Sequence, residues 1–329
     1  MSVVDRKAEL SLALSAVRAA ARATTRVQDT LISVETLEKK DKSPVTIGDF
    51  AAQAIVGSEL SKRSAIRSLI GEESANDLRQ NADLRARVVE LVQAVAPDLD
   101  EGDVLEAIDF GGADPNATGG THYTLDPIDG TKGFLRKEQY AIALGLIVEG
   151  ELELAVLGCP RLENPDGSIG GLYYAIRGEG AYRLPLEGES LEGEPISVDA
   201  IDDPSKARFC ESVESGHSDQ DWSVQVARSL GITSDAVRMD SQAKYASLAR
   251  GDASIYLRLP TRKGYEEKIW DHAAGALIVE EAGGKVTDID GKPLDFSKGA
   301  TLRENRGVIA SSGRFHDAIV RAVKAFEPR

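Results

Sequence analysis

At 329 residues the chain is long enough for about two domains, or for two halves that share one core. Its 39 Lys and Arg residues against 54 Asp and Glu residues give a formal net charge of −15. This balance argues against nucleic-acid binding and against docking on anionic lipid, because both need a dense positive field. With 42% hydrophobic and 28% charged residues the composition is that of a globular protein, not of a disordered or fibrous one.

Cysteine usage and hydropathy point to a reducing compartment. The two cysteines, Cys159 and Cys210, cannot build a disulfide framework, and no C-x-x-C pair is present. Residues 10–21 are interrupted by Arg18, so we interpret them as part of an amphipathic helix and not as a signal sequence. No apolar stretch reaches the roughly 18 residues needed to span a bilayer. We therefore expect a cytoplasmic protein.

The N-terminal part of the chain is predicted to be mainly helical. Apolar residues recur at helical spacing from about 4 to 37, which predicts a long first helix. The stretch 37–49 is rich in Lys and contains Pro44, a composition typical of a solvated loop. Helical spacing returns from Asp49 to about Arg63, and Asp49 stands where an N-cap residue would.

The middle of the chain is predicted to form strands. A short strand at 68–73 ends on Glu72 and Glu73 and is followed by a polar helix at 82–94. Strand-like runs separated by turn signals then predict an antiparallel meander, at 122–126, 140–150, 151–160 and 171–184.

An acidic connection at 185–202, which contains glycines and prolines, is the predicted domain boundary. It divides the chain into an N-terminal α+β domain, 1–198, and a C-terminal α/β domain, 199–329. In the second part predicted strands and helices alternate, as in β-α units, at 208–213, 218–231, 236–240, 243–251, 252–259 and 270–284.

The string LDPIDGT at 125–131 is the most informative candidate site. Asp126 and Asp129 are bent around a proline and can converge on one point, with the carbonyl of Ile128 between them as a further oxygen ligand. Oxygen-only ligation of this kind is what Mg²⁺ selects. The amides of Gly130 and Thr131 open a helical turn whose N-terminus favours an anion. Taken alone, the string is also compatible with a plain Pro-Asp-Gly turn at the end of a strand.

Other acids have equally plain alternatives when they are considered one at a time. Asp271 precedes a predicted helix and Asp49 begins one, so each is explained by an N-cap. Glu72 and Glu73 follow a strand and fit a solvated loop.

The combination changes that interpretation. In this order, IGEES at 70–74, LDPIDGT at 125–131 and IWDHAAG at 269–275 strongly resemble the lithium-sensitive, magnesium-dependent phosphatases. That family includes inositol monophosphatases, fructose-1,6-bisphosphatases and 3'(2'),5'-bisphosphate nucleotidases, and SPVTIGDFAAQ at 43–53 matches the segment that precedes these motifs. The resemblance runs from about 42 to 312. It implies a layered αβαβα fold with the site in a cleft between the two halves.

The resemblance also implies roles for the acids. Two or three Mg²⁺ ions would be held by acidic side chains and one main-chain oxygen: Glu72, Asp126, Asp129, Asp271 and the carbonyl of Ile128. Thr131 and Asp49 match the pair that activates water, with the Thr131 hydroxyl bonding the nucleophile and Asp49 accepting the proton. Glu73 would support these groups from behind, and the loop at 39–43 would close over the site.

Within the family, three stretches resemble the fungal-type 3'(2'),5'-bisphosphate nucleotidases, at 211–218, 239–260 and 265–275. The implied substrate is adenosine 3',5'-bisphosphate, cleaved to AMP and phosphate, with a related activity on 3'-phosphoadenosine 5'-phosphosulfate. The implied nucleotide ligands, besides Gly130 and Thr131, are His217, Ser241, Lys244 and Arg258. Lys and Arg suit the uncleaved phosphate, as a point charge and a forked donor.

Bland alternatives remain for these residues and for the function. Lys244 and Arg258 would also fit surface charges, and His217 would fit a polar loop. A rival substrate is an inositol monophosphate or polyphosphate, and a rival of another kind is a catalytically silent, metal-binding regulatory protein. We further expect a monomer, inhibition by lithium ions and no nucleic-acid or membrane partner.

Overall fold

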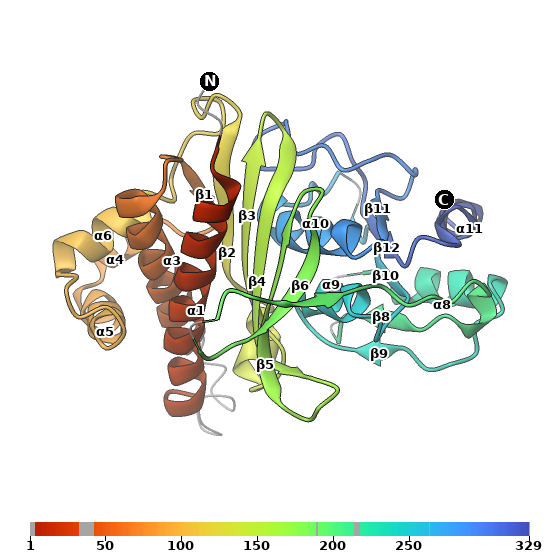
Figure 1. Ribbon diagram of the computed structural model, residues 1–329, viewed down its shortest axis with the longest axis horizontal. Helices are drawn as coiled ribbons and strands as arrows, with labels where there is room; N and C mark the ends of the chain where they lie inside the picture. The colour runs from red at the N-terminus through yellow and green to blue at the C-terminus, as the bar shows by residue number, and fades with distance from the viewer. Residues whose placement is uncertain (1–3, 33–42, 189, 214–217, 263, 329) are drawn as a thin grey trace.

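The computed structural model describes residues 4–32, 43–188, 190–213, 218–262 and 264–328. Within them, helices and sheets alternate as five layers, shown in Figure 1: outer helices, a large sheet, two inner helices, a small sheet and a last pair of helices. The predicted layered α/β fold is confirmed. None of the helices in the described ranges is long and apolar enough to cross a bilayer.

The large sheet has seven strands that follow their order in the sequence. The first pairs with the second in parallel, and every later neighbour is antiparallel, as the predicted meander requires. Its strands are β1 (Leu69–Gly71), β2 (Thr121–Asp129), β3 (Ala141–Val148), β4 (Glu151–Glu163), β5 (Ile169–Ile176), β6 (Gly180–Pro185) and β7 (Glu194–Ile196). The run predicted at 171–184 is divided into β5 and β6, because Gly178, in the turn, and Gly180, at the start of β6, take positive φ.

Long helices cover the outer face of this sheet, as the red and orange segments of Figure 1 show. They are α1 (Arg6–Thr30) and α3 (Ser43–Arg63). The shorter α4 (Asn76–Gln80), α5 (Ala82–Gln93) and α6 (Glu101–Asp109) follow β1 in the chain. A five-residue helix, α7 (Thr131–Leu135), follows β2. The sequence pattern predicted α1, α3 and α5 and missed α4 and α6.

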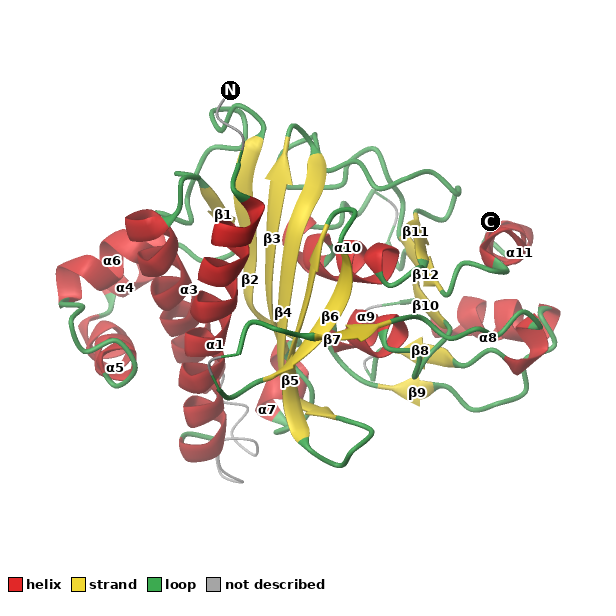
Figure 2. Ribbon diagram, viewed as in Figure 1, coloured by secondary structure: helices red, strands yellow, loops and turns green. Residues whose placement is uncertain are grey.

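The C-terminal half adds the other layers, which Figure 2 distinguishes as red helices and yellow strands. Its small sheet has the order β11-β12-β10-β8-β9. The strands are β8 (Phe209–Glu211), β9 (Val237–Arg238), β10 (Ile255–Arg258), β11 (Lys285–Thr287) and β12 (Val308–Ser311). The helical segments are η1 (Pro204–Lys206), α8 (Gln220–Ser229), α9 (Ala243–Ala249), η2 (Ile269–Asp271), α10 (Ala273–Glu281) and α11 (His316–Ala325).

Three apolar clusters fill the spaces between the layers. Leu154 and Val156 of β4 face the cluster under α1 and α3, whereas Ala155 and Leu157 face the cluster around α9 and α10. A third cluster lies between the small sheet and α8 and α11. Because both faces of the central strands are buried, these strands are almost continuously apolar. The middle cluster contains residues from both sides of residue 198, so the two halves share it; the domain boundary itself stays a prediction.

Two helix boundaries differ from the prediction. The first helix ends at Thr30, and the end predicted at 37 lies outside the described residues. The second helix begins at Ser43, six residues before the predicted start, so Asp49 lies inside it and is not its N-cap. Pro44 lies in the first turn of this helix and not in a loop, because proline is tolerated there, where its missing N–H needs no partner.

Candidate active site

The acidic motifs meet at one edge of the large sheet. β1 and β2 run in parallel with Gly71 beside Leu125, so the residues that follow β1 lie next to the end of β2. There, a cavity of about 310 Å³ is lined by residues of both halves. They are Glu72, Asp126, Ile128, Asp129, Gly130, Thr131, Lys132, Leu135, Ser241, Gln242, Lys244, Tyr256, Arg258 and Asp271.

A β-bulge brings the two acids of the LDPIDGT string to the same cavity. Asp126 pairs with Ala143 and Asp129 with Ala141, so three residues of β2 oppose two of β3 over this step. In a regular strand, residues three apart point to opposite faces, and one extra residue reverses this. Pro127 fits such a bulge because it has no N–H to contribute to the ladder. Both carboxylates line the same cavity, and their role as metal ligands stays a prediction.

Ile128 turns its side chain away from the acids. The side chain is 2% exposed and belongs to the cluster under α1 and α3. It packs so closely on α3 that a Cβ at Gly48 would lie 2.7 Å from Ile128 Cδ1. The main chain of Ile128 is therefore the part that can serve the cavity.

Gly130 joins β2 to α7 in a conformation that suits only glycine. Its φ is 91°, and a Cβ at this position would lie 2.8 Å from Cβ of Ser241. Ser241 itself has φ 67°, an uncommon value for a residue with a side chain. Thr131 then begins α7 with its side chain exposed in the cavity. The two turns that carry Gly130 and Ser241 thus lie against each other across the site.

The carboxylates are close enough to perturb one another. Burial, followed by the charges of Glu72 and Asp129, raises the pKa of Asp126 well above its usual range. Burial and the charge of Glu73 raise the pKa of Glu72 to about 7, and burial and Asp129 raise the pKa of Asp271 to about 7. Such like charges favour either protonation or a bound cation.

The donor set fits Mg²⁺. The Oδ1 atom of Asp126 is buried without a hydrogen-bond partner among the described residues. It belongs to a group of carboxylates and one main-chain segment that offers only oxygen, and such ligands are those of a hard divalent cation.

Asp49 and Glu73 lie behind this cluster. Asp49 is 9% exposed, and its pKa is raised by burial and then by the charges of Glu73 and Glu72. The main chain of Glu73 is held by Gln53, whose Oε1 accepts from the Glu73 N–H at 3.0 Å and whose Nε2 donates to the Glu73 carbonyl at 2.7 Å. Among the described residues, those lining the cavity include neither Asp49 nor Glu73.

The predicted basic residues Lys244 and Arg258 line the same cavity from the C-terminal half. Lys244 is 3% exposed, its Nζ lies 5.2 Å from the centroid of the Tyr256 ring, and it donates to the Met239 carbonyl at 3.4 Å. Burial lowers the pKa of Lys244, and the charge of Asp129 opposes this. Arg258, at the end of β10, is partly buried. Neither is a surface charge. His217 lies outside the described residues, as do residues 39–42 of the predicted closing loop.

Sequence reasoning missed several residues that the fold places here. Gln242 donates from its main chain to Asp129 Oδ2 at 2.5 Å, and its side chain joins the Trp270 carbonyl to the Gly275 N–H. Its position next to Ser241, in the stretch that resembles nucleotidases, could have indicated that Gln242 lies at the site. Tyr256, two residues before Arg258 on β10, shares its face of the strand.

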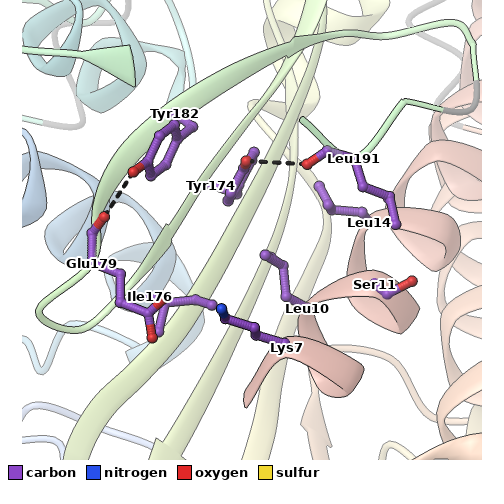
Figure 3. Close-up of a pocket in the computed structure, with 9 residues that line it drawn as sticks. All are labelled: Lys7, Leu10, Ser11, Leu14, Tyr174, Ile176, Glu179, Tyr182 and Leu191. Atoms are coloured by element: carbon purple, nitrogen blue, oxygen red, sulfur yellow. Dashed lines mark hydrogen bonds between the residues drawn. The ribbon is translucent and has the colours of Figure 1, made fainter. Parts of the chain in front are cut away.

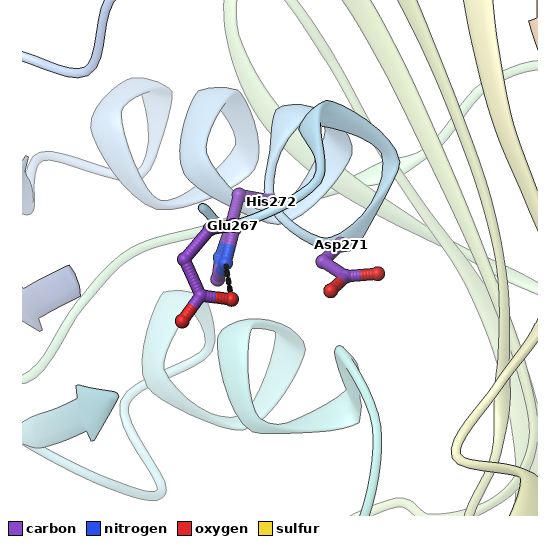
Figure 4. A group of neighbouring side chains, drawn as sticks. All are labelled: Glu267, Asp271 and His272. Atoms are coloured by element: carbon purple, nitrogen blue, oxygen red, sulfur yellow. Dashed lines mark hydrogen bonds and ion pairs between the residues drawn. The ribbon is translucent and has the colours of Figure 1, made fainter. Parts of the chain in front are cut away.

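Asp271 lies close to two other titratable groups. Glu267, Asp271 and His272 each offer a ligand atom within 4.8 Å of the others. Figure 4 shows the Glu267 carboxylate directed at the His272 ring, with Asp271 beside them. Glu267 also forms an ion pair with Arg258, so it already has a cationic partner.

A second hollow, on the far side of the large sheet, has a different chemistry. It measures about 320 Å³ and lies between α1 and the strands β5 and β6 (Figure 3). Its Tyr174 and Tyr182 hydroxyls donate to the main-chain carbonyls of Leu191 and Glu179. Lys7 and Glu179 are the charged residues among those described as lining it, so it lacks the acids needed for a metal site.

Comparison with known proteins agrees with this geometry. The sequence matches the inositol monophosphatase family over residues 6–327. The chain belongs to this family. It is 45% identical to a 3'(2'),5'-bisphosphate nucleotidase of Schizosaccharomyces pombe, over 97% of this chain and 95% of the relative. It is 43% identical to a probable 3'(2'),5'-bisphosphate nucleotidase 4 of Arabidopsis thaliana, over 96% of this chain and 94% of the relative.

Solved structures support the fold. An inositol monophosphatase of Zymomonas mobilis superposes with a TM-score of 0.64 at 18% identity, over 99% of this chain and all (100%) of that one. One from Anabaena gives 0.62 at 19% identity, over 98% and 96%. The resemblance to the nucleotidase branch, including fungal members, is confirmed, and so is the prediction of an enzyme of the phosphatase class.

Proposed function

We propose that the protein is a Mg²⁺-dependent phosphatase that hydrolyses the 3'-phosphate of adenosine 3',5'-bisphosphate, giving AMP and phosphate. 3'-Phosphoadenosine 5'-phosphosulfate is proposed as a second substrate. One observation carries the proposal: four carboxylates converge with a buried lysine and an arginine in one cavity. The chain that builds this cavity is 45% identical to a bisphosphate nucleotidase.

A cation is needed to reconcile the protein with this substrate. The net charge of −15 and the carboxylate cluster would repel a bisphosphate. We propose that two or three Mg²⁺ ions are held by the acidic side chains and one carbonyl: Glu72, Asp126, Asp129, Asp271 and Ile128. When bound, Mg²⁺ lowers the pKa of its water and offsets the charge on the phosphate.

Two residues of the chain would then position the attacking water and accept its proton. The Thr131 hydroxyl, exposed in the cavity, holds the attacking water by a hydrogen bond. A threonine is too weak a base at neutral pH, so Asp49 takes the proton; its raised pKa suits a group that must be protonated in the reaction. The amide of Gly130 faces the phosphate that is cleaved.

The second phosphate and the nucleoside require the cavity residues of the C-terminal half. Lys244 and Arg258 are proposed to hold the uncleaved 5'-phosphate, and Ser241 adds a hydroxyl. His217 is proposed to contact the base or ribose.

A substrate panel tests the proposal. Phosphate release is measured with Mg²⁺ from adenosine 3',5'-bisphosphate, the sulfonucleotide, adenosine 3'-phosphate and inositol 1-phosphate, with and without Li⁺. The bisphosphate is expected to have the highest kcat/KM, and Li⁺ to inhibit. Faster release from inositol 1-phosphate would favour the inositol phosphatase alternative. No release from any of them, together with Mg²⁺ binding, would favour the regulatory protein.

A further inference from the structure

Arg258 lies between two carboxylates of different kinds. Its Nε donates to Glu267 Oε1 at 3.2 Å and its Nη2 lies 3.1 Å from Glu267 Oε2, so Glu267 grips one edge of the guanidinium with both oxygens. The same Nη2 forms a second, longer ion pair with Asp271 Oδ2, at 3.7 Å. Glu267 has no assigned part in the chemistry, whereas Asp271 is a proposed Mg²⁺ ligand.

Glu267 is itself held by a buried chain of hydrogen bonds. His272 Nε2 lies 3.3 Å from Glu267 Oε2, and His272 Nδ1 lies 2.8 Å from the Tyr245 hydroxyl. Because a carboxylate can only accept, His272 donates from Nε2 and accepts from the Tyr245 O–H at Nδ1. Tyr245 and His272 are each 1% exposed and Glu267 is 5% exposed. The Glu267 carboxylate is therefore fixed on the side of Arg258 that is away from the cavity.

This arrangement gives Arg258 a close ion pair with Glu267 and limits its contact with Asp271, a proposed metal ligand, to one longer ion pair. A guanidinium and Mg²⁺ compete for the same carboxylate oxygens. If Glu267 were lost, Asp271 would be the nearest carboxylate to Arg258 Nη2 among the described residues. We propose that Glu267 is a positioning residue that keeps Arg258 from pairing more closely with Asp271, leaving the Asp271 oxygens for Mg²⁺ and Arg258 for the substrate phosphate. The inference rests on the metal assignment within the proposed function.

The first test replaces the charge and keeps the shape. In Glu267→Gln, the Mg²⁺ concentration that gives half of the maximal rise in Tm is expected to increase at least about tenfold over wild type. Glu266→Gln is the matched control, because Glu266 is exposed and accepts from the Thr301 hydroxyl at 2.6 Å, away from Arg258. Its half-saturating Mg²⁺ concentration is expected to equal that of wild type. Substrate is absent, so the readout does not depend on activity.

The second test separates this mechanism from a general structural role of Glu267. In Arg258→Met/Glu267→Gln there is no guanidinium to move onto Asp271, so half-saturation is expected to return to within about threefold of wild type. If Glu267 only supported the fold, the double variant would bind Mg²⁺ as weakly as the single one.

Distinct results overturn the inference and the proposed function. A Glu267→Gln variant with wild-type Mg²⁺ dependence, or a double variant without recovery, overturns the inference and leaves the phosphatase standing. A wild-type protein without any Mg²⁺-dependent rise in Tm overturns the metal assignment and the inference with it. Should Glu267→Gln fail to fold, Arg258→Met alone decides, since the inference predicts Mg²⁺ binding at least as tight as wild type and a tenfold loss contradicts it.

Discussion

Asp126 is the residue at which the repulsion within the site is concentrated. It is 3% exposed, and its raised pKa reflects burial together with the charges of neighbouring acids. Ionised Asp126 therefore destabilises the fold without metal, and under the proposed function bound Mg²⁺ would remove that penalty. We predict that Asp126→Asn abolishes phosphatase activity, raises Tm in EDTA and loses most of the Mg²⁺-dependent rise in Tm. Differential scanning calorimetry with and without Mg²⁺ measures all but the activity. A lower Tm in EDTA, or near-normal turnover, would contradict this account.

Thr131 carries a hydroxyl rather than a charge, so its loss should affect chemistry more than metal binding. We predict that Thr131→Ala lowers kcat by roughly 10²- to 10⁴-fold, the range for proton transfer by a positioned group. The Mg²⁺ concentration for half-maximal stabilisation should be nearly unchanged. Thr131→Ser keeps the hydroxyl and is the control, and an equal loss of kcat in both variants would tell against the proposed role.

Arg258 is expected to read the uncleaved phosphate. We predict that Arg258→Ala lowers kcat/KM for adenosine 3',5'-bisphosphate. The expected loss of transition-state stabilisation is about 1.5 to 3 kcal/mol, the range for hydrogen bonds to charged groups. Adenosine 3'-phosphate lacks the 5'-phosphate and should react almost as with wild type. Steady-state kinetics on both substrates checks this, and the same loss on both would remove the assignment.

At the scale of elements, α10 explains why its motif ends in glycine. A Cβ at Gly275 would lie 2.2 Å from Cδ2 of the Tyr245 ring, so the two helices α9 and α10 approach through this residue. The close approach places the Tyr245 hydroxyl at His272 and the N-terminus of α10 at Gln242. The packing of α9 on α10 thus joins the part of the cavity that carries Asp271 to the part that carries Ser241 and Lys244.

The packing predicts an unfavourable alanine where alanine normally helps. In an ordinary helix Gly→Ala stabilises by about 0.5 to 1 kcal/mol. We predict that Gly275→Ala instead destabilises by roughly 1 to 3 kcal/mol, because the added methyl overpacks the Tyr245 ring. Gly102→Ala in α6 is the control: that residue is exposed and its Cβ would meet nothing closer than Asp100 Oδ1 at 3.1 Å. Urea unfolding of both variants measures the difference, and a stable Gly275→Ala variant would refute the argument.

At the scale of the whole molecule, buried histidines make the stability depend on pH. Burial lowers the pKa of His122 and of His316 to about 4. His316 fastens α11 to the small sheet through Thr287 Oγ1 at 2.8 Å and Ser311 Oγ at 2.7 Å. Because Thr287 donates to a carbonyl, it accepts from His316 Nε2, and Nδ1 accepts from Ser311. Protonation of His316 would remove that last acceptor.

The direction in which the folding stability changes with pH follows from the direction of the His316 pKa shift. The folded value, about 4, lies below the unfolded value of about 6.5, so the unfolded state binds more protons between these pH values. The contribution of neutral His316 is complete above about pH 6.5 and is lost as the pH falls toward 4. We predict that wild type loses roughly 2 kcal/mol more than His316→Gln between pH 8 and pH 4.5. Chemical denaturation over this range measures both curves, and parallel curves would contradict the prediction. Comparing the two proteins cancels the acidic cluster, whose raised pKa values act in the opposite direction.

How far the sequence leads can be judged from particular residues. Periodicity predicted the meander from β2 to β6, because strands buried on both faces are apolar runs bounded by turns. Three motifs in a fixed order predicted the family, because a family can be identified from short strings of residues without knowing how the chain folds between them. The helix start predicted at Asp49 was wrong, because a helix start with Pro44 in its first turn has the composition of a loop. The first helix ends at Thr30, before the end predicted at about 37.

The sequence by itself determined the chemical content of the site: carboxylates, a bulge-forming proline and glycines in short ordered strings. Only the tertiary structure decided which of them meet. Asp126 and Asp129 converge because β2 gains one residue against β3, and Asp271 joins them because α10 packs on Tyr245 at Gly275. Glu267 was not recognisable as a partner of Arg258 from sequence. Their pairing depends on the distance between a strand end and a loop in three dimensions, which local patterns do not encode.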